Sequence, residues 1–253
     1  MRILVCAFFL LASITHAGSV EKVVAYKQDK AELEGFLALP ASAGIHPGII
    51  VVPDWMGVGE NSKMRARMLA ALGYIALVAD VYGKNARPKN SKEAGELATS
   101  YKGNRNLMRA RMKAAYNTLL AQTGVDRNKI VVMGYCFGGT AALELARSGA
   151  ALKGTVTFHG GLSTPTPQDA KNIHGQVFAM TGGDDPAVPP AEVEAFEKEM
   201  RDAKVDWRVL VFGGAVHAFT IKEIGTGNSV AAYNEKADHR SWEELKSFLK
   251  EVF

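Results

Sequence analysis

The sequence predicts an α/β fold in which a mostly parallel sheet carries helices on both faces. Short apolar runs alternate with amphipathic segments of about 10 to 20 residues along most of the 253-residue chain, which is the pattern of repeated β-α-β units. No internal repeat and no linker rich in Pro, Gly or Ser divides the chain. Its length suits one large domain better than two small ones.

The first 17 residues have the features of a cleaved export signal. A positively charged start leads into an apolar run at residues 3–14, and Thr15 and Ala17 then supply small residues where a signal peptidase cuts. This run of about a dozen residues is short for a membrane-spanning helix, which needs about 20. We therefore expect residues 1–17 to be removed after Ala17, leaving a mature domain of residues 18–253 in the periplasm or outside the cell. A buried N-terminal strand and a short anchor are the alternatives.

The composition argues against nucleic acids, membranes and metals as partners. The formal net charge is +4, but the basic residues are spread along the chain. Arg105, Arg109 and Arg111 lie at helical spacing and are expected to form a solvated face. No segment after the signal is apolar enough to cross a membrane, and the six histidines show no metal-ligand spacing. A monomer and a small homo-oligomer are both compatible with the sequence.

Strands and helices are expected in alternation along the mature chain. The first two strands form an antiparallel hairpin, and the first helix ends at Gly73, a C-cap glycine. The expected strands are residues 20–26, 33–39, 48–52, 74–78, 130–133, 154–158, 176–180 and 207–212. The expected helices are residues 61–72, 140–148, 190–203 and 230–253, with two more within 92–122 that are separated near Gly103 and Asn104.

Cys136 is the candidate nucleophile. The other cysteine, Cys6, lies in the expected signal, so the mature chain would carry one thiol and no internal disulfide. Cys136 is the centre of a Gly-x-Cys-x-Gly motif between a strand and a helix, where a sharp turn requires small flanking residues. The unpaired N–H groups and the dipole of the following helix favour a thiolate there. A buried structural cysteine in a glycine-rich turn is the alternative.

Asp185 and His217 are the expected partners of this thiol. Each follows its own strand, in the order nucleophile, acid, histidine that a nucleophile at such a strand-to-helix turn requires. Because the carboxyl ends of parallel strands share one edge of a sheet, the three side chains should meet there. His217 would take the thiol proton and later activate water, while Asp185 would hold the imidazole tautomer. The alternative is that each is an ordinary solvated residue of a loop.

Other residues at this edge are candidates for an oxyanion hole and a pocket. The backbone N–H of Phe137, directly after the nucleophile, is one expected oxyanion donor, and that of Trp55 is the other. Each such donor is typically worth about 3 kcal/mol of the barrier. Asp80 and Tyr82 end a strand on the same edge and could line the pocket. His-Gly-Gly at residues 159–161 is expected to form a tight structural turn.

Four segments together resemble the dienelactone hydrolase family. They are Gly-Tyr-Cys-Phe-Gly-Gly at 134–139, Asp-Pro at 185–186, His-x-Phe at 217–219, and Ala-Tyr-Asn followed by Ala and Arg-Ser-Trp within 232–242. The match runs from about residue 35 to residue 249. It implies a single-domain α/β-hydrolase fold, no metal or organic cofactor, and hydrolysis of a small ester or lactone through a thioester intermediate. It also implies that Cys136, Asp185 and His217 form the catalytic triad.

Two positions depart from what is expected of this family. Asp54 stands where a Glu keeps the resting thiol neutral, and it is one methylene shorter. Ile221 stands where an Arg clamps the carboxylate of dienelactone, and an apolar side chain cannot pair with a carboxylate. Together with the export signal, Ile221 predicts a substrate other than dienelactone. Asp54, Tyr82 and Ile221 are therefore the candidate thiol-gating and pocket residues.

Two other functions fit the same scaffold. The triad could perform different acyl chemistry, such as thioester hydrolysis, peptide hydrolysis or acyl transfer, because the fold alone does not set the reaction. The chain could also be a binding protein that keeps the hydrolase frame without turnover, an alternative supported by the changes at Asp54 and Ile221.

Overall fold

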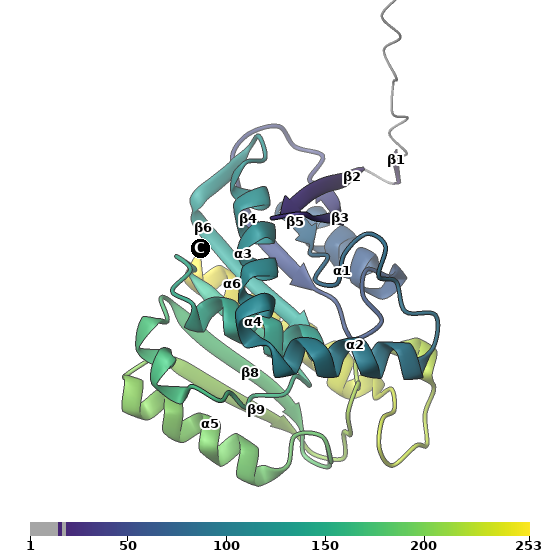
Figure 1. Cartoon of the computed structure of the whole chain (residues 1–253), viewed down its shortest axis with the longest axis vertical. Helices are drawn as coiled ribbons and strands as arrows, with labels where there is room; N and C mark the ends of the chain where they lie inside the picture. Colours follow the sequence, from purple (N-terminus) through teal and green to yellow (C-terminus); the bar gives the residue numbers. More distant parts are fainter. Residues whose placement is uncertain (1–14, 17–18) are drawn as a thin grey trace, which may run out of the picture.

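The computed structural model describes residues 15–16 and 19–253, and in this part of the chain a mixed sheet of nine strands lies between layers of helices (Figure 1). The predicted export signal lies almost wholly outside the described residues, which include only Thr15–His16 of it, as strand β1. The order across the sheet is β1-β2-β3-β5-β4-β6-β7-β8-β9. Pairs are antiparallel from β1 to β5 and parallel from β5 to β9. The predicted α/β class with a mostly parallel sheet is confirmed.

Every strand and helix that the sequence predicts has a counterpart in the structure. The strands are β2 (Ser19–Gln28), β3 (Ala31–Leu39), β4 (His46–Val52), β5 (Ile75–Val78), β6 (Val125–Tyr135), β7 (Gly154–Phe158), β8 (Gln176–Gly182) and β9 (Trp207–Phe212). The helices are α1 (Glu60–Ala71), α2 (Ser91–Gly103), α3 (Arg105–Leu120), α4 (Phe137–Arg147), α5 (Pro190–Ala203) and α6 (Glu235–Val252). Two short 3-10 helices, η1 (Pro167–Asn172) and η2 (Lys222–Ile224), complete the described elements.

Alternate side chains of the central strands face opposite helical layers. In β4, Ile50 and Val52 pack in a core with α2, α3 and α4, whereas Ile49 and Val51 pack with α1 and α6. Helix α5 joins the first of these layers and packs on β8 and β9. In Figure 1, α3 and α4 lie in front of the sheet and α6 lies behind it. Burial on both faces explains why the sequences of these strands are nearly continuous runs of apolar residues.

The nucleophile candidate is the single residue between β6 and α4. Strand β6 ends at Tyr135 and helix α4 begins at Phe137. The sequence predicts a helix start at residue 140, after Gly138 and Gly139. That boundary is wrong, since both glycines pack closely against other parts of the chain and belong to the first turn of α4.

The last helix starts later than predicted, and the residues before it contact the loop of His217. Helix α6 is Glu235–Val252, with Asn234 as its side-chain cap, whereas the sequence predicts a start at residue 230. The N–H of Ala232 donates to the carbonyl of His217 at 3.1 Å, and the N–H of Asn234 donates to the carbonyl of Phe219 at 3.1 Å. These bonds hold the segment against the His217 loop in place of a further helical turn.

The predicted solvated arginine face on α3 is wrong. Arg109 donates to Glu144 at 2.7 Å and to Asp169 at 2.7 Å, and Arg111 is only 8% exposed. Arg105 is half-buried. Helix α3 packs against α4, so Arg109 meets carboxylates from distant parts of the sequence, which helical spacing alone does not reveal.

A buried ion-pair cluster links α4 to α5. Arg147 is fully buried and forms two 2.8 Å hydrogen bonds with the carboxylate of Glu199 and one of 3.2 Å with Glu144. It also donates to the carbonyl of Leu162 at 2.9 Å. A buried arginine needs such complete pairing, because an unpaired charge in the core is strongly destabilising. The cluster therefore fixes α5 and the segment after β7 relative to α4.

Candidate active site

Cys136 has a strained backbone conformation at the turn between β6 and α4. Its φ of 52° and ψ of −118° lie outside the regions that L residues prefer. The turn is held by two backbone hydrogen bonds of 3.0 Å, from the N–H of Cys136 to the carbonyl of Phe158 and from the N–H of Gly139 to the carbonyl of Cys136. Conformations of this kind cost about 1–3 kcal/mol and cluster at functional sites.

The glycines around Cys136 allow backbone segments to approach more closely than any side chain would permit. A Cβ at Gly134 would lie 2.1 Å from the carbonyl oxygen of Gly138. A Cβ at Gly138 would lie 2.3 Å from the carbonyl oxygen of Val52, at the end of β4. The first turn of α4 is therefore pressed against the loop after β4, which carries Trp55.

The structure brings Cys136, Asp185 and His217 together from three loops. Nε2 of His217 lies 3.0 Å from the Sγ of Cys136, and Nδ1 lies 2.8 Å from Oδ2 of Asp185. The Asp185 side chain is fully buried, and its second oxygen accepts a 2.8 Å hydrogen bond from the N–H of Ala187. Sulfur, imidazole and carboxylate thus form one hydrogen-bonded chain.

The surroundings of His217 favour its charged form. Burial lowers the pKa of this imidazole, but hydrogen bonds to Asp185 and Cys136, together with the negative charges of these two groups, outweigh burial and raise it from 6.5 to about 10. An imidazolium can donate from both ring nitrogens, to the carboxylate on one side and to a thiolate on the other. The arrangement is therefore suited to an imidazolium held between the Asp185 carboxylate and the Cys136 sulfur.

His159, predicted as part of a structural turn, also contacts the site. Its ring is fully buried, lies 5.4 Å from the ring of His217, and shares a 2.8 Å hydrogen bond with the hydroxyl of Thr220. Burial, and then the charge of His217, hold the pKa of His159 well below its usual value, so its imidazole is neutral. The position of this residue at the carboxyl end of β7 is the sequence signal that could have placed it at the site.

The two predicted oxyanion donors lie on adjoining segments. Phe137 is the first residue of α4, so its N–H has no acceptor within the helix. Trp55 lies in the loop after β4, where the carboxylate of Asp54 accepts a 2.8 Å hydrogen bond from the N–H of Met56. Among the described residues, neither the N–H of Phe137 nor that of Trp55 has a hydrogen-bond acceptor.

The predicted gating and pocket residues have different environments. Asp54 is half-buried, and burial, with a further effect of Glu223, raises the pKa of its carboxyl group. Tyr82 is 5% exposed and packs on Phe137, with ring centroids 5.2 Å apart. Ile221 is half-buried at the start of the segment that carries Glu223.

Asp80 is a structural residue, so its predicted place in the pocket lining is wrong. Its carboxylate is 1% exposed and accepts 2.9 Å hydrogen bonds from the N–H groups of Gly83 and Glu34. Arg87 lies 3.2 Å from the same carboxylate. These contacts with β3 and the loop after β5 use both oxygens.

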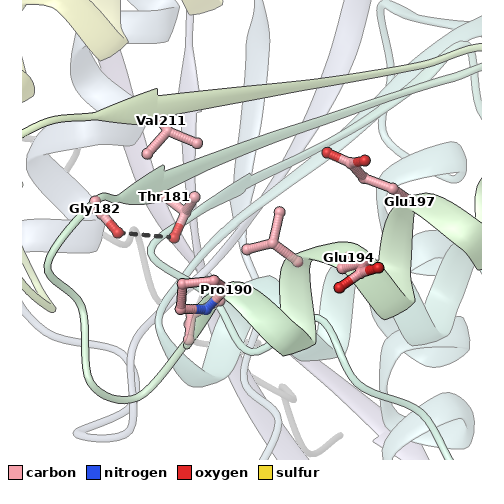
Figure 2. Close-up of a pocket in the computed structure, with 9 residues that line it drawn as sticks. Thr181, Gly182, Pro190, Glu194, Glu197 and Val211 are labelled. Carbon is pink, nitrogen blue, oxygen red and sulfur yellow. Dashed lines mark hydrogen bonds between the residues drawn. The ribbon is translucent and has the colours of Figure 1, made fainter.

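A separate pocket lies beyond the Asp185 loop, between the ends of β8 and β9 and the first turns of α5 (Figure 2). Its volume is about 350 Å³. Its lining residues are Thr181, Gly182, Gly183, Val188, Pro190, Val193, Glu194, Glu197 and Val211. Neither Cys136 nor His217 lines it, so this pocket is not the cavity in which the thiol would act.

The described residues, 15–16 and 19–253, contain neither a metal-binding cluster nor a membrane-spanning helix. No group of three or more His, Cys, Asp and Glu side chains in this part of the chain is arranged to hold a metal ion. No helix within the same residues has both the length and the apolar character needed to span a bilayer.

A family model and several known proteins match this chain over most of its length. The model described as the dienelactone hydrolase family matches residues 33–253. The crystal structure of a dienelactone hydrolase-like promiscuous phosphotriesterase from metagenomic libraries is 37% identical, covers 94% of this chain and 100% of its own, and has a TM-score of 0.88. A Saccharolobus solfataricus protein named "Putative carboxymethylenebutenolidase" is 28% identical over 92% of this chain and 99% of its own. A Bradyrhizobium protein named "Probable 2-oxo-3-(5-oxofuran-2-ylidene)propanoate lactonase" is 27% identical over 73% of this chain and 77% of its own.

Proposed function

Because the chain belongs to the dienelactone hydrolase family and is an ester or lactone hydrolase, we propose that it cleaves its substrate through a thioester on Cys136. The observation that carries this proposal is the hydrogen-bonded chain from Sγ of Cys136 through His217 to Asp185, with distances of 3.0 and 2.8 Å. The strained backbone of Cys136 at a helix N-terminus supports it independently.

In the proposed first step, the Cys136 thiolate attacks the carbonyl carbon of an ester or lactone. A carbon–sulfur bond forms and the carbonyl electrons move to oxygen. When the tetrahedral intermediate collapses, the carbon–oxygen bond breaks and the leaving alkoxide takes the proton on Nε2 of His217. Asp185, which lies 2.8 Å from Nδ1, stabilises the imidazolium before this transfer.

In the second step, neutral His217 takes a proton from water, and the resulting hydroxide attacks the thioester. Collapse breaks the carbon–sulfur bond, releases the acid and restores the thiolate beside the imidazolium. The raised pKa of His217, about 10, supports a resting ion pair of this kind. We propose that the N–H groups of Phe137 and Trp55 hold the negative oxygen in both steps.

The proposed substrate is a small neutral ester or lactone. Ile221 offers no charge to a substrate carboxylate, and the charges of Asp54 and of Glu223, which acts on Asp54, would repel one. An uncharged substrate avoids both effects. The same triad could act on thioesters, peptides or acyl acceptors other than water, and a substrate panel distinguishes these reactions.

Phosphotriester hydrolysis is a second candidate activity, favoured by the 37% identity to a dienelactone hydrolase-like promiscuous phosphotriesterase over 94% of this chain. The thiolate would attack phosphorus, expel an aryloxide and form an S-phosphoryl cysteine, which water would then hydrolyse. A neutral phosphotriester fits the same requirement for an uncharged substrate.

We also propose that the protein is exported, since residues 1–17 have a charged start, an apolar run and small residues before the expected cut. Fractionation of producing cells and N-terminal sequencing of the product test this. A cytoplasmic product that retains residues 1–17 would contradict it.

The test of the mechanism compares the parent protein with Cys136→Ala and Cys136→Ser on a panel of p-nitrophenyl esters, small lactones, thioesters and aryl phosphotriesters. We expect turnover in the parent, none in Cys136→Ala, and a large loss in Cys136→Ser, because a hydroxyl is harder to deprotonate than a thiol. Intact-mass spectrometry of the parent should detect an acyl adduct on Cys136. Turnover that survives in Cys136→Ala would rule out the thiol mechanism. Absence of turnover in every variant, with ligand binding retained, would favour a binding protein.

A further inference from the structure

Tyr82 lies between the two segments that carry the expected oxyanion donors. It follows β5 and is at the same sheet edge as Cys136. Its ring centroid is 5.2 Å from that of Phe137, the residue after the nucleophile. On its other side, a Cβ built at Gly57 would lie only 3.6 Å from the Tyr82 ring. The ring therefore bridges the Trp55–Gly57 loop and the first residue of α4.

The Tyr82 ring is held in place by its neighbours. Tyr101 of α2 packs on it with ring centroids 5.3 Å apart, and the Tyr101 hydroxyl donates to the Tyr82 carbonyl at 3.1 Å. Tyr82 itself is 5% exposed. A side chain packed on three sides cannot swing away to find a different partner, so the ring stays between these segments.

The Tyr82 hydroxyl is buried, yet it has no hydrogen-bond partner among the described residues. The Tyr101 hydroxyl, in the same aromatic cluster, does have one. Buried polar groups are nearly always paired, so an unpaired one needs an explanation. Burial and the nearby charges of Cys136 and Asp54 raise the pKa of Tyr82, which keeps its hydroxyl protonated and therefore a donor.

We infer that the Tyr82 hydroxyl is a third oxyanion donor, which hydrogen-bonds the substrate oxygen when the Cys136 thiolate attacks. This inference rests on the proposed thiol mechanism. No proton leaves Tyr82: the negative charge moves from sulfur to the substrate oxygen, the hydroxyl donates to that oxygen, and the charge then passes to the leaving group, which takes its proton from His217. The hydroxyl stabilises the negatively charged oxygen of the transition state more than the neutral carbonyl oxygen of the bound substrate.

The test uses Tyr82→Phe, with Tyr101→Phe as the matched control. Both variants remove one buried hydroxyl from the same aromatic cluster. For p-nitrophenyl acetate, Tyr82→Phe should lower kcat by about 100-fold or more with little change in KM. Its melting temperature should stay level or rise, because the lost hydroxyl had no partner. Tyr101→Phe should lower the melting temperature and leave kcat close to that of the parent.

The rate of iodoacetamide alkylation of Cys136 separates a donor to the substrate from a residue that positions the thiol. Alkylation forms no oxyanion, so Tyr82→Phe should alkylate as fast as the parent. The inference is overturned if Tyr82→Phe keeps the parental kcat while Cys136→Ala is inactive. It is also overturned if alkylation slows in parallel with kcat, or if both tyrosine variants lose activity equally. Turnover in Cys136→Ala is a different result, since it removes the thiol mechanism itself.

Discussion

Replacing Asp185 by Asn tests the electrostatic basis of the proposed mechanism. The asparagine has almost the same size and leaves the packing of the loop intact, but it carries no charge. Its amide can also donate to Nδ1 of His217, which would place the ring proton on the wrong nitrogen. The control is Asp184→Asn, which removes the same negative charge from the residue next to Asp185 in the sequence. The side chain of Asp184 is exposed.

The size of the effect follows from the pKa of His217. A rise from 6.5 to about 10 corresponds to about 5 kcal/mol in favour of the imidazolium. Asp185 and Cys136 share this effect, so removing the carboxylate charge should cost roughly 2–3 kcal/mol, or about 50-fold in the equilibrium constant for forming the ion pair. The change of tautomer adds to the loss in turnover, which should lie between about 50-fold and about 10⁴-fold.

Two measurements on each variant test this reasoning. At pH 7, Asp185→Asn should slow both the alkylation of Cys136 by iodoacetamide and kcat/KM for p-nitrophenyl acetate, whereas Asp184→Asn should change neither. Chemical unfolding between pH 6 and pH 10 gives the second measurement. The pKa of His217 in the folded protein lies above its unfolded value of 6.5, so the charged imidazole makes its full contribution to the free energy of unfolding below about pH 6.5. That contribution is lost as the pH rises through about 10.

The stability advantage of the parent over Asp185→Asn should therefore shrink towards pH 10. An Asp185→Asn variant that alkylates and turns over as fast as Asp184→Asn would refute the reasoning. An advantage that grows with pH would refute the assigned direction of the pKa.

Other predictions concern the packing of the turn and of the core. Gly138→Ala places a Cβ 2.3 Å from the carbonyl oxygen of Val52, so it should lower the melting temperature and abolish turnover. Gly213→Ala should do neither, because a Cβ there meets nothing within 4 Å. Equal melting curves for the two variants would contradict this prediction. Arg147→Met leaves the buried carboxylates of Glu144 and Glu199 without their partner and should cost about 3–5 kcal/mol in urea unfolding. Lys198→Met, which breaks an exposed ion pair, should cost less than about 1 kcal/mol, and a similar loss in both variants would contradict the assignment.

Much of the fold could be predicted because each strand is short, apolar and bounded by turn residues. The same pattern places Cys136, Asp185 and His217 after three different strands, and parallel pairing then sets them at one edge of the sheet. Local sequence is sufficient to place these three residues at one edge, because parallel pairing brings the carboxyl ends of the strands together.

Contacts between distant segments could not be predicted from local patterns. The spacing of Arg105 and Arg109 marks one helical face but does not say that α4 covers it. Asp80 lies at the expected sheet edge, yet the N–H groups of Gly83 and Glu34 occupy its carboxylate. His159 likewise looks like a turn residue until its ring is seen beside that of His217.

The hydrogen bonds between the His217 loop and the residues just before α6 make the docking of that helix a condition for the geometry of the proposed triad. Hydrogen bonds from Ala232 and Asn234 to the carbonyls of His217 and Phe219 hold the loop, and Asn234 also caps the last helix. Loss of these contacts would leave the loop without its anchor, so the proposed base would no longer be held 3.0 Å from the Sγ of Cys136. Segments far apart in the sequence therefore have to dock before the proposed site is complete.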